Sequence, residues 1–82
     1  MPGIDESLGF YPLRIAVLTV SDTRTEQTDG SGTLLVNRLR DAGHELADRA
    51  IVRDDVDQIR TMVQEWVDDR QIDVIITTGG TG

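Results

Sequence analysis

Apolar residues occupy both faces of the segment 14–20, which predicts a buried β-strand at the centre of a sheet. Ile15 and Val17 would lie on one face, and the residues that alternate with them would lie on the other. Burial of both faces is typical of a central parallel strand. Segments 45–52 and 72–77 also have strand character, but 45–52 carries two charged residues in its middle and is expected nearer an edge.

Two segments repeat apolar residues at helical spacing and are predicted to be helices. Segment 33–42 is followed by Gly43, a typical helix stop. Segment 56–69 has the stronger pattern, and the pair Asp55 and Gln58 ahead of it resembles a capping box. The tryptophan of this helix is expected in the core. Its apolar stripe consists of Val56, Ile59, Val63, Trp66 and Val67.

The alternation of strands and helices predicts an α/β fold whose helices are right-handed crossovers between parallel strands. Two strand orders are compatible with this pattern. If strand 14–20 lies between the other two, the winding reverses there and a crevice opens beyond its carboxyl end. Ser21 and Asp22 would then lie beside the glycines at 79–82.

Composition limits the chemistry of this 82-residue chain, which is long enough for one domain at most. It has no cysteine, and its single histidine, His44, is expected in an exposed loop. No apolar run is long enough to span a membrane and no signal-peptide pattern opens the chain, so we expect a soluble cytoplasmic protein. Residues 1–12 contain two prolines and two glycines and are expected to form a flexible arm.

The charge balance affects the choice of partner. The formal net charge is −7 and all eight basic residues are arginines, so the chain should repel nucleic acid and anionic membranes. A phosphate-bearing ligand would need backbone N–H groups, an arginine, or Mg²⁺ held by aspartates. Without a lysine the chain cannot form a Walker A loop.

Four polar segments lie where parallel α/β sheets bind their ligands. Asp22 could hold Mg²⁺ or merely start an Asx-turn, and Ser31 could cap a helix or help its N-terminus bind an anion. One of Asp54 and Asp55 is expected to cap the second helix, which leaves the other for a metal or substrate. Segment 77–82 has three glycines among four residues, which exceeds the need of a turn and favours a ligand loop.

Five motifs taken together resemble one family. They are Thr-Val-Ser-Asp at 19–22, Asp-Gly-Ser-Gly at 29–32, Ala-Gly-His-Glu at 42–45, Ile-Val-Arg-Asp-Asp at 51–55 and Thr-Thr-Gly-Gly-Thr-Gly at 77–82. In this order they resemble the MoaB/Mog family of molybdenum-cofactor biosynthesis proteins, which includes the G domain of gephyrin, and most of all its MoaB branch. The resemblance implies a three-layer α/β/α fold with a mostly parallel sheet, in which strand 14–20 lies between the other two strands.

The resemblance also implies the site residues. Asp22 and Asp54 would be catalytic and would bind Mg²⁺, although Arg53 and Asp55 stand where the family has a proline and a glutamate beside the second aspartate. The remaining contacts to the pterin ligand would come from Ser21, Asp29, Ser31, Gly32, Thr78, Gly79, Gly80, Thr81 and Gly82.

The family binds molybdopterin, its active members transfer AMP from ATP to the molybdopterin phosphate with Mg²⁺, and its members form trimers or hexamers. Family members continue well beyond the glycine loop. The resemblance therefore implies that residues 13–82 are the N-terminal part of a molybdopterin-binding domain and are inactive alone. Two alternatives remain: a pterin-binding or scaffold protein without catalysis, and a generic nucleotide-binding α/β domain.

Overall fold

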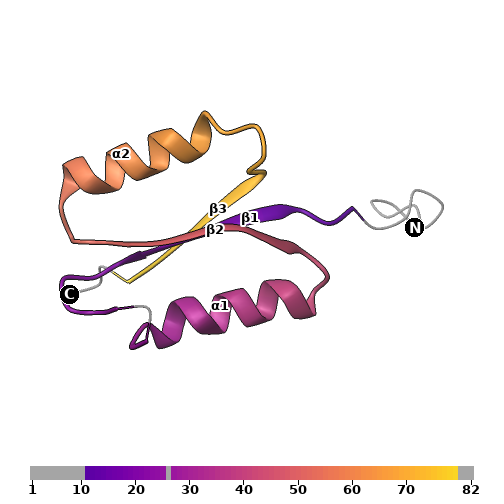
Figure 1. Cartoon of the computed structure of the whole chain (residues 1–82), viewed down its shortest axis with the longest axis horizontal. Coiled ribbons are helices and arrows are strands. Elements are labelled where there is room, and N and C mark those ends of the chain that lie inside the picture. The colour runs from indigo at the N-terminus through magenta and orange to yellow at the C-terminus, as the bar shows by residue number, and fades with distance from the viewer. Residues whose placement is uncertain (1–10, 26, 80–82) are drawn as a thin grey trace, which may run out of the picture.

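Strands and helices alternate in the computed structural model, which describes residues 11–25 and 27–79. The expected arm at 1–12 therefore lies almost wholly outside the described residues. Pairing is parallel throughout, and the strand order β2-β1-β3 places β1 in the centre, as one of the two predicted orders requires (Figure 1). The elements are β1 (Arg14–Val20), α1 (Gly30–Asp41), β2 (Glu45–Val52), α2 (Val56–Val67) and β3 (Val74–Gly79).

The two helices cover opposite faces of the sheet, which gives the predicted α/β/α layers (Figure 1). The direction of each crossover explains this arrangement. Helix α1 connects β1 to its neighbour β2, whereas α2 returns from β2 past β1 to β3. Because right-handed connections that run in opposite directions lie on opposite faces, the chain winds doubly around β1.

The core lies on both sides of β1, as its apolar pattern predicts. Ile15 and Val17 pack with α1, and the alternate residues pack against Trp66 of α2. Trp66 is 4% exposed, so the prediction of a core tryptophan is confirmed. Each side chain buried in this way contributes about 1.5–3 kcal/mol of hydrophobic stabilisation.

Strand β2 contains an irregularity that changes which of its residues face each helix. Ile15 pairs with Leu46, but the next residue of β1 pairs with Asp48, so Ala47 is skipped as a bulge. Leu46 packs on the α1 side, whereas Ala50 packs on the α2 side. Because strand residues alternate between faces, these two even-numbered positions would share a face without the extra residue.

The C-terminus of α1 confirms the predicted glycine stop. Gly43 has a φ of 90°, and its N–H donates to the carbonyl of Arg40 at 2.9 Å. The N–H of His44 donates to the carbonyl of Leu39 at 2.9 Å, which completes a Schellman motif. His44 was predicted to be exposed, but it is half-buried because its Nδ1 accepts a hydrogen bond from the N–H of Leu13 at 3.0 Å.

Several predicted boundaries were wrong by two or three residues. Helix α1 begins at Gly30 instead of residue 33, since its cap lies farther upstream than expected. Strand β3 begins at Val74 because the N–H of Ile72 closes a turn onto the carbonyl of Asp69. The predicted stripe of α2 is exposed at both ends, at Val56 and Val67, because the core contacts only its middle turns. Within the described residues, neither helix has the length and hydropathy that a bilayer crossing requires.

Candidate functional site at the carboxyl edge of the sheet

The carboxyl ends of the strands and the first turns of both helices share one edge of the molecule, which we call the rim (Figure 1). Every described residue that the sequence predicted for the site lies on this rim. Gly80, Thr81 and Gly82 lie outside the described residues. The predicted site residues on the rim are Ser21, Asp22, Asp29, Ser31, Gly32, Asp54, Thr78 and Gly79.

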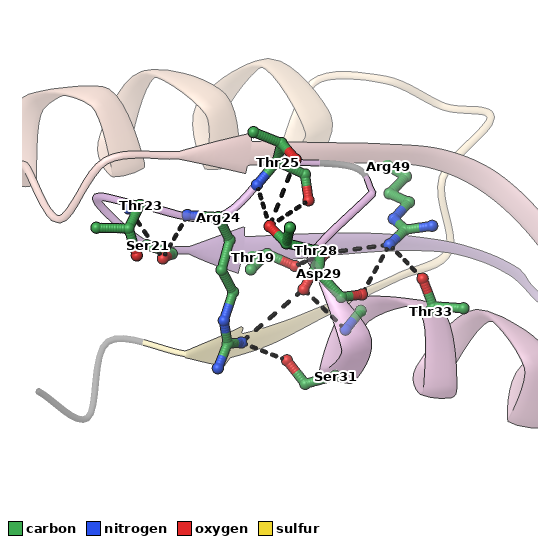
Figure 2. Close-up of polar contacts among 11 residues, drawn as sticks. Thr19, Ser21, Thr23, Arg24, Thr25, Thr28, Asp29, Ser31, Thr33 and Arg49 are labelled. Atoms are coloured by element: carbon green, nitrogen blue, oxygen red, sulfur yellow. Dashed lines mark hydrogen bonds and ion pairs between the residues drawn. The ribbon is translucent and has the colours of Figure 1, made fainter.

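Ser21 organises the loop that leaves β1. Its hydroxyl oxygen accepts hydrogen bonds from the N–H groups of Thr23 at 3.3 Å and Arg24 at 3.2 Å, and its own N–H donates to the carbonyl of Val52 at 2.8 Å. Arg24 then turns back toward α1, where its Nη1 donates to the hydroxyl of Ser31 at 2.8 Å (Figure 2).

Asp22 and Asp54 come from neighbouring strand ends and are linked directly. The N–H of Asp54 donates to Oδ1 of Asp22 at 3.1 Å. Asp55 is the N-cap of α2, since its Oδ1 accepts from the N–H groups of Asp57 at 2.8 Å and Gln58 at 3.4 Å. Asp54 is therefore free of the capping role, and its side chain is exposed on the rim.

The predicted capping box at α2 forms in one direction only. The cap residue Asp55 is confirmed, but the amide oxygen of Gln58 accepts from the N–H of Arg53 at 3.3 Å instead of bonding back to the cap. This bond fixes the backbone just ahead of Asp54 and helps to hold that residue at the rim.

Asp29 is the buried centre of the α1 end of the rim, with 1% of its surface exposed. Its Oδ2 accepts from the hydroxyl of Thr19 at 2.6 Å and from Nη2 of Arg49 at 3.1 Å, and its Oδ1 accepts from the N–H of Gly32 at 3.0 Å (Figure 2). Asp29 is the N-cap of α1, so of the two roles considered for Ser31 the capping role is wrong.

The electrostatics of Asp29 reflect these contacts. Burial alone would raise the pKa of its carboxyl group, because the charged form loses hydration. The hydrogen bonds from Thr19, Gly32 and Arg49, together with the positive charge of Arg49, outweigh burial and hold the pKa of Asp29 below its ordinary value. Arg24 adds a longer ion pair, with its Nη1 at 3.9 Å from Oδ1 of Asp29.

Two rim glycines are required by close packing. A Cβ on Gly32 would overlap the carboxylate of Asp29 and lie 2.8 Å from the hydroxyl oxygen of Thr19. Gly79 has a φ of 86°, and a Cβ there would overlap the carbonyl oxygen of Val20. Glycine is therefore needed at both positions for the fold itself, and any ligand contact by these residues would be additional.

The first turn of α1 retains a free donor. The N–H groups of Gly30 and Gly32 are bonded to the carbonyl of Thr28 and to the carboxylate of Asp29. Ser31 follows Gly30 directly, and its N–H has no partner within the described residues. A free N–H at a helix N-terminus can bind an anion such as phosphate.

Asp22 and Asp54 are the two residues on the rim whose carboxylates could take part in binding Mg²⁺. Mg²⁺ is commonly bound by one or two carboxylates, with phosphate oxygens and water completing its shell. The described residues contain no cluster of three acidic or histidine side chains that could enclose a metal by themselves. The rim thus offers a partial site of the kind that a metal–nucleotide complex would complete.

Sequence reasoning missed Arg24 and Arg49, and it included Thr19 only as part of the motif at 19–22, without a role of its own. Arg49 could have been found, because an arginine within a strand whose faces are covered by helices needs a buried acidic partner. Thr19 gave a weaker signal as the one polar residue among residues 15–20 of the central strand.

Fold and rim together place the chain in the class of doubly wound α/β domains, which bind ligands beyond the carboxyl ends of their strands. Within this class the chain belongs to the family described as "Probable molybdopterin binding domain", whose sequence model matches residues 16–82. The family assignment made from the five motifs is therefore confirmed.

The chain is similar to several proteins named molybdenum cofactor biosynthesis protein B. It is 43% identical to that of Escherichia coli strain K12 over 76 residues, covering 93% of this chain and 45% of the relative. It is 44% identical to that of Bacillus subtilis strain 168 over 70 residues, covering 85% of this chain and 41% of the relative. The chain thus spans less than half the length of these relatives.

A solved structure supports the same likeness. It is described as the crystal structure of molybdenum cofactor biosynthesis protein B and superimposes with a TM-score of 0.84 at 43% sequence identity. The match covers 88% of this chain and 45% of that one. The α/β fold with β1 in the centre therefore agrees with a solved relative.

Proposed function

We propose that this chain is part of a protein of molybdenum cofactor biosynthesis that binds molybdopterin at the rim and, at full length, transfers AMP from ATP to the molybdopterin phosphate. The family assignment supports the pterin ligand. The observation that carries the transfer reaction is the bond between the N–H of Asp54 and the carboxylate of Asp22, which brings two acidic residues together beside the ligand edge.

The α1 end of the rim suits a ligand that carries phosphate. The N–H of Ser31, which has no partner among the described residues, lies at the positive end of the helix dipole, and Arg24 bonds to the hydroxyl of the same serine at 2.8 Å. Thr78, near the carboxyl end of the neighbouring strand β3, pairs with Thr19 and is half-buried. These donors provide local attraction for an anion in a chain whose net charge is −7.

The chemistry we propose needs no protein nucleophile. An oxygen of the molybdopterin phosphate attacks the α-phosphorus of ATP, a new P–O bond forms, and the bond to pyrophosphate breaks so that pyrophosphate leaves. Mg²⁺, if held by Asp22 and Asp54, would offset negative charge on the ATP phosphates. The chain's own residues orient the two reactants and hold them in line, which is the main task of a protein in phosphoryl and nucleotidyl transfer.

Asp54→Asn in the full-length protein tests this assignment. The variant keeps the size of the side chain but removes its charge, so we expect AMP transfer to fall more than about tenfold, or about 1.4 kcal/mol of transition-state stabilisation. Molybdopterin binding should stay near the wild-type level. A radiolabelled-AMP transfer assay measures the first quantity, and calorimetry with purified molybdopterin measures the second.

Asp55→Asn is the matched control, because it removes the same charge from the adjacent residue and asparagine remains a good N-cap. We expect near-normal transfer from this variant. Normal turnover by Asp54→Asn would contradict its catalytic role. A wild-type protein that binds molybdopterin but transfers no AMP would support a non-catalytic binding or scaffold protein instead.

A further inference from the structure

Two consecutive charged residues of β2 lie on opposite faces of the sheet, and the bulge at Ala47 determines which helix each of them faces. Asp48 points to the α2 side, where its Oδ2 accepts from the indole N–H of Trp66 at 3.1 Å. Arg49 points to the α1 side and reaches Asp29. Both contacts join β2 to a helix, but only the contact through Arg49 reaches the rim where ligand contacts are proposed.

The side chain of Arg49 makes its hydrogen bonds to the described residues through one nitrogen. Its Nη2 donates to Oδ2 of Asp29 at 3.1 Å, to the carbonyl of Asp29 at 3.3 Å and to the hydroxyl of Thr33 at 2.9 Å (Figure 2). Its side chain is 22% exposed, and its Nε is buried without a partner among the described residues. The guanidinium is therefore hydrogen-bonded both to the N-cap residue of α1 and to the first turn of that helix.

These contacts fix the residues that precede and follow Ser31. Asp29 is held by Arg49 on one oxygen and in turn holds the N–H of Gly32 with the other. Ser31 lies between them, so its free N–H and its hydroxyl take their direction from a turn that is clamped on both sides. A displacement of this turn by even 1 Å would misdirect those donors, and errors of this size cost about 10²-fold in enzyme rates.

We propose that Arg49 is a positioning residue for the rim: through Asp29 it sets the direction in which Ser31 presents its donors to the ligand. This inference rests on the proposed function, because it assigns Ser31 to the molybdopterin-binding edge. In this proposal Arg49 has no contact of its own with the ligand. It acts only through the first turn of α1.

The test compares Arg49→Met with Arg49→Lys in the full-length protein. Methionine keeps the length and apolar character of the stem but makes no bond to Asp29, so we expect molybdopterin affinity to fall by at least about tenfold in calorimetry. Lysine supplies three donors on a single nitrogen, which is what the contacts of Nη2 require, and should restore affinity to within about threefold of wild type. Arg60→Met, on the exposed side of α2, is the matched control and should bind normally.

A second measurement needs no ligand. Amide hydrogen exchange should show the N–H of Gly32 exchanging at least about tenfold faster in Arg49→Met than in wild type, while the amides of α2 stay unchanged. A purely structural role would lower the melting temperature but leave the affinity of the folded protein intact. Normal affinity of Arg49→Met below its melting temperature, or a lysine variant no better than the methionine variant, would overturn the proposal.

Failure of the proposed function would look different. A wild-type protein that binds no molybdopterin would contradict the function, whereas the exchange of the Gly32 amide would still report whether Arg49 holds the turn.

Discussion

Asp29 is a buried carboxylate that is stabilised in its charged form by the hydrogen-bond donors around it. It connects two strands with the start of α1. Thr19 of β1 and Arg49 of β2 both bond to its Oδ2, so the carboxylate joins two neighbouring strands to the start of α1. Taking a carboxylate out of water is costly unless such partners replace its hydration. The same partners that hold its pKa low therefore make its charge a net contributor to folding.

Asp29→Asn in the full-length protein should destabilise the fold by about 3 kcal/mol at neutral pH, because it leaves the guanidinium of Arg49 largely buried without its counter-charge. The pKa of Asp29 is lower in the folded protein than its ordinary value of 3.8, so the stabilisation by its charge is complete above that value. It is lost as the pH falls through the lower, folded pKa. The stability gap between wild type and variant should therefore shrink in acid.

Urea unfolding at a series of pH values from neutral to strongly acidic checks this prediction. Asp41→Asn, at the exposed C-terminal end of α1, is the control and should show a small gap throughout. A gap for Asp29→Asn that does not change with pH would show that the charge of Asp29 contributes nothing to stability.

At the scale of elements, alternation and helical spacing in the sequence predicted all five elements and their order. Strands β1 and β2 match their predicted bounds. For β1 the signal is the run of apolar residues on both faces, and for β2 it is Gly43 shortly before the strand. The start of α1 was missed because Gly30 and Gly32 are poor helix formers, and tertiary contacts of Asp29 override that propensity.

The rim could be predicted only in part. Strand ends in a parallel fold must meet at one edge, so the sequence located Asp22 and Asp54 correctly. The bond between them and the burial of Asp29 depend on pairing across 32 and 20 residues of chain, respectively. Local sequence patterns carry no signal for contacts of that separation.

Two glycines in the first turn of α1 allow the effect of side-chain packing to be separated from the effect of helix propensity. Gly32→Ala should destabilise the protein by about 2–3 kcal/mol, because the new methyl group overlaps the carboxylate of Asp29 and crowds the hydroxyl of Thr19. Gly30→Ala is the matched control: nothing lies within 4 Å of its Cβ position, and the change should stabilise by about 0.4–1 kcal/mol. Thermal and urea unfolding of both variants would measure the difference, and equal effects would contradict the packing seen around Asp29.

At the scale of the whole molecule, the sheet is incomplete in the part of the chain that the structure describes. Strands β2 and β3 each pair with β1 on one side, and their outer edges have no partner strand among the described residues. The side chains of β3 are at best half-buried, although most of them are apolar. Unpaired, apolar strand edges favour association with another chain.

We therefore expect residues 1–82, when produced alone, to be marginally stable, to self-associate and to lack adenylyltransferase activity. A chain of this size buries only about 60% of its unfolded surface, which leaves little reserve of stability. Sedimentation velocity and thermal melting of this polypeptide would check the physical part. A monodisperse monomer with a sharp transition above about 65 °C would contradict it.

The bulge at Ala47 also determines how related chains should be aligned. The pairing of β1 with β2 would be unbroken if Ala47 were absent, since Leu46 and Asp48 already oppose consecutive residues of β1. An insertion or deletion at this position leaves every later residue of β2 facing the same helix as before. If the length change were placed farther along the strand, the residues between Ala47 and that point would be aligned with residues on the opposite face. Length differences among homologues within this strand should therefore be assigned to position 47, so that Arg49 is compared with the residue that faces the same helix.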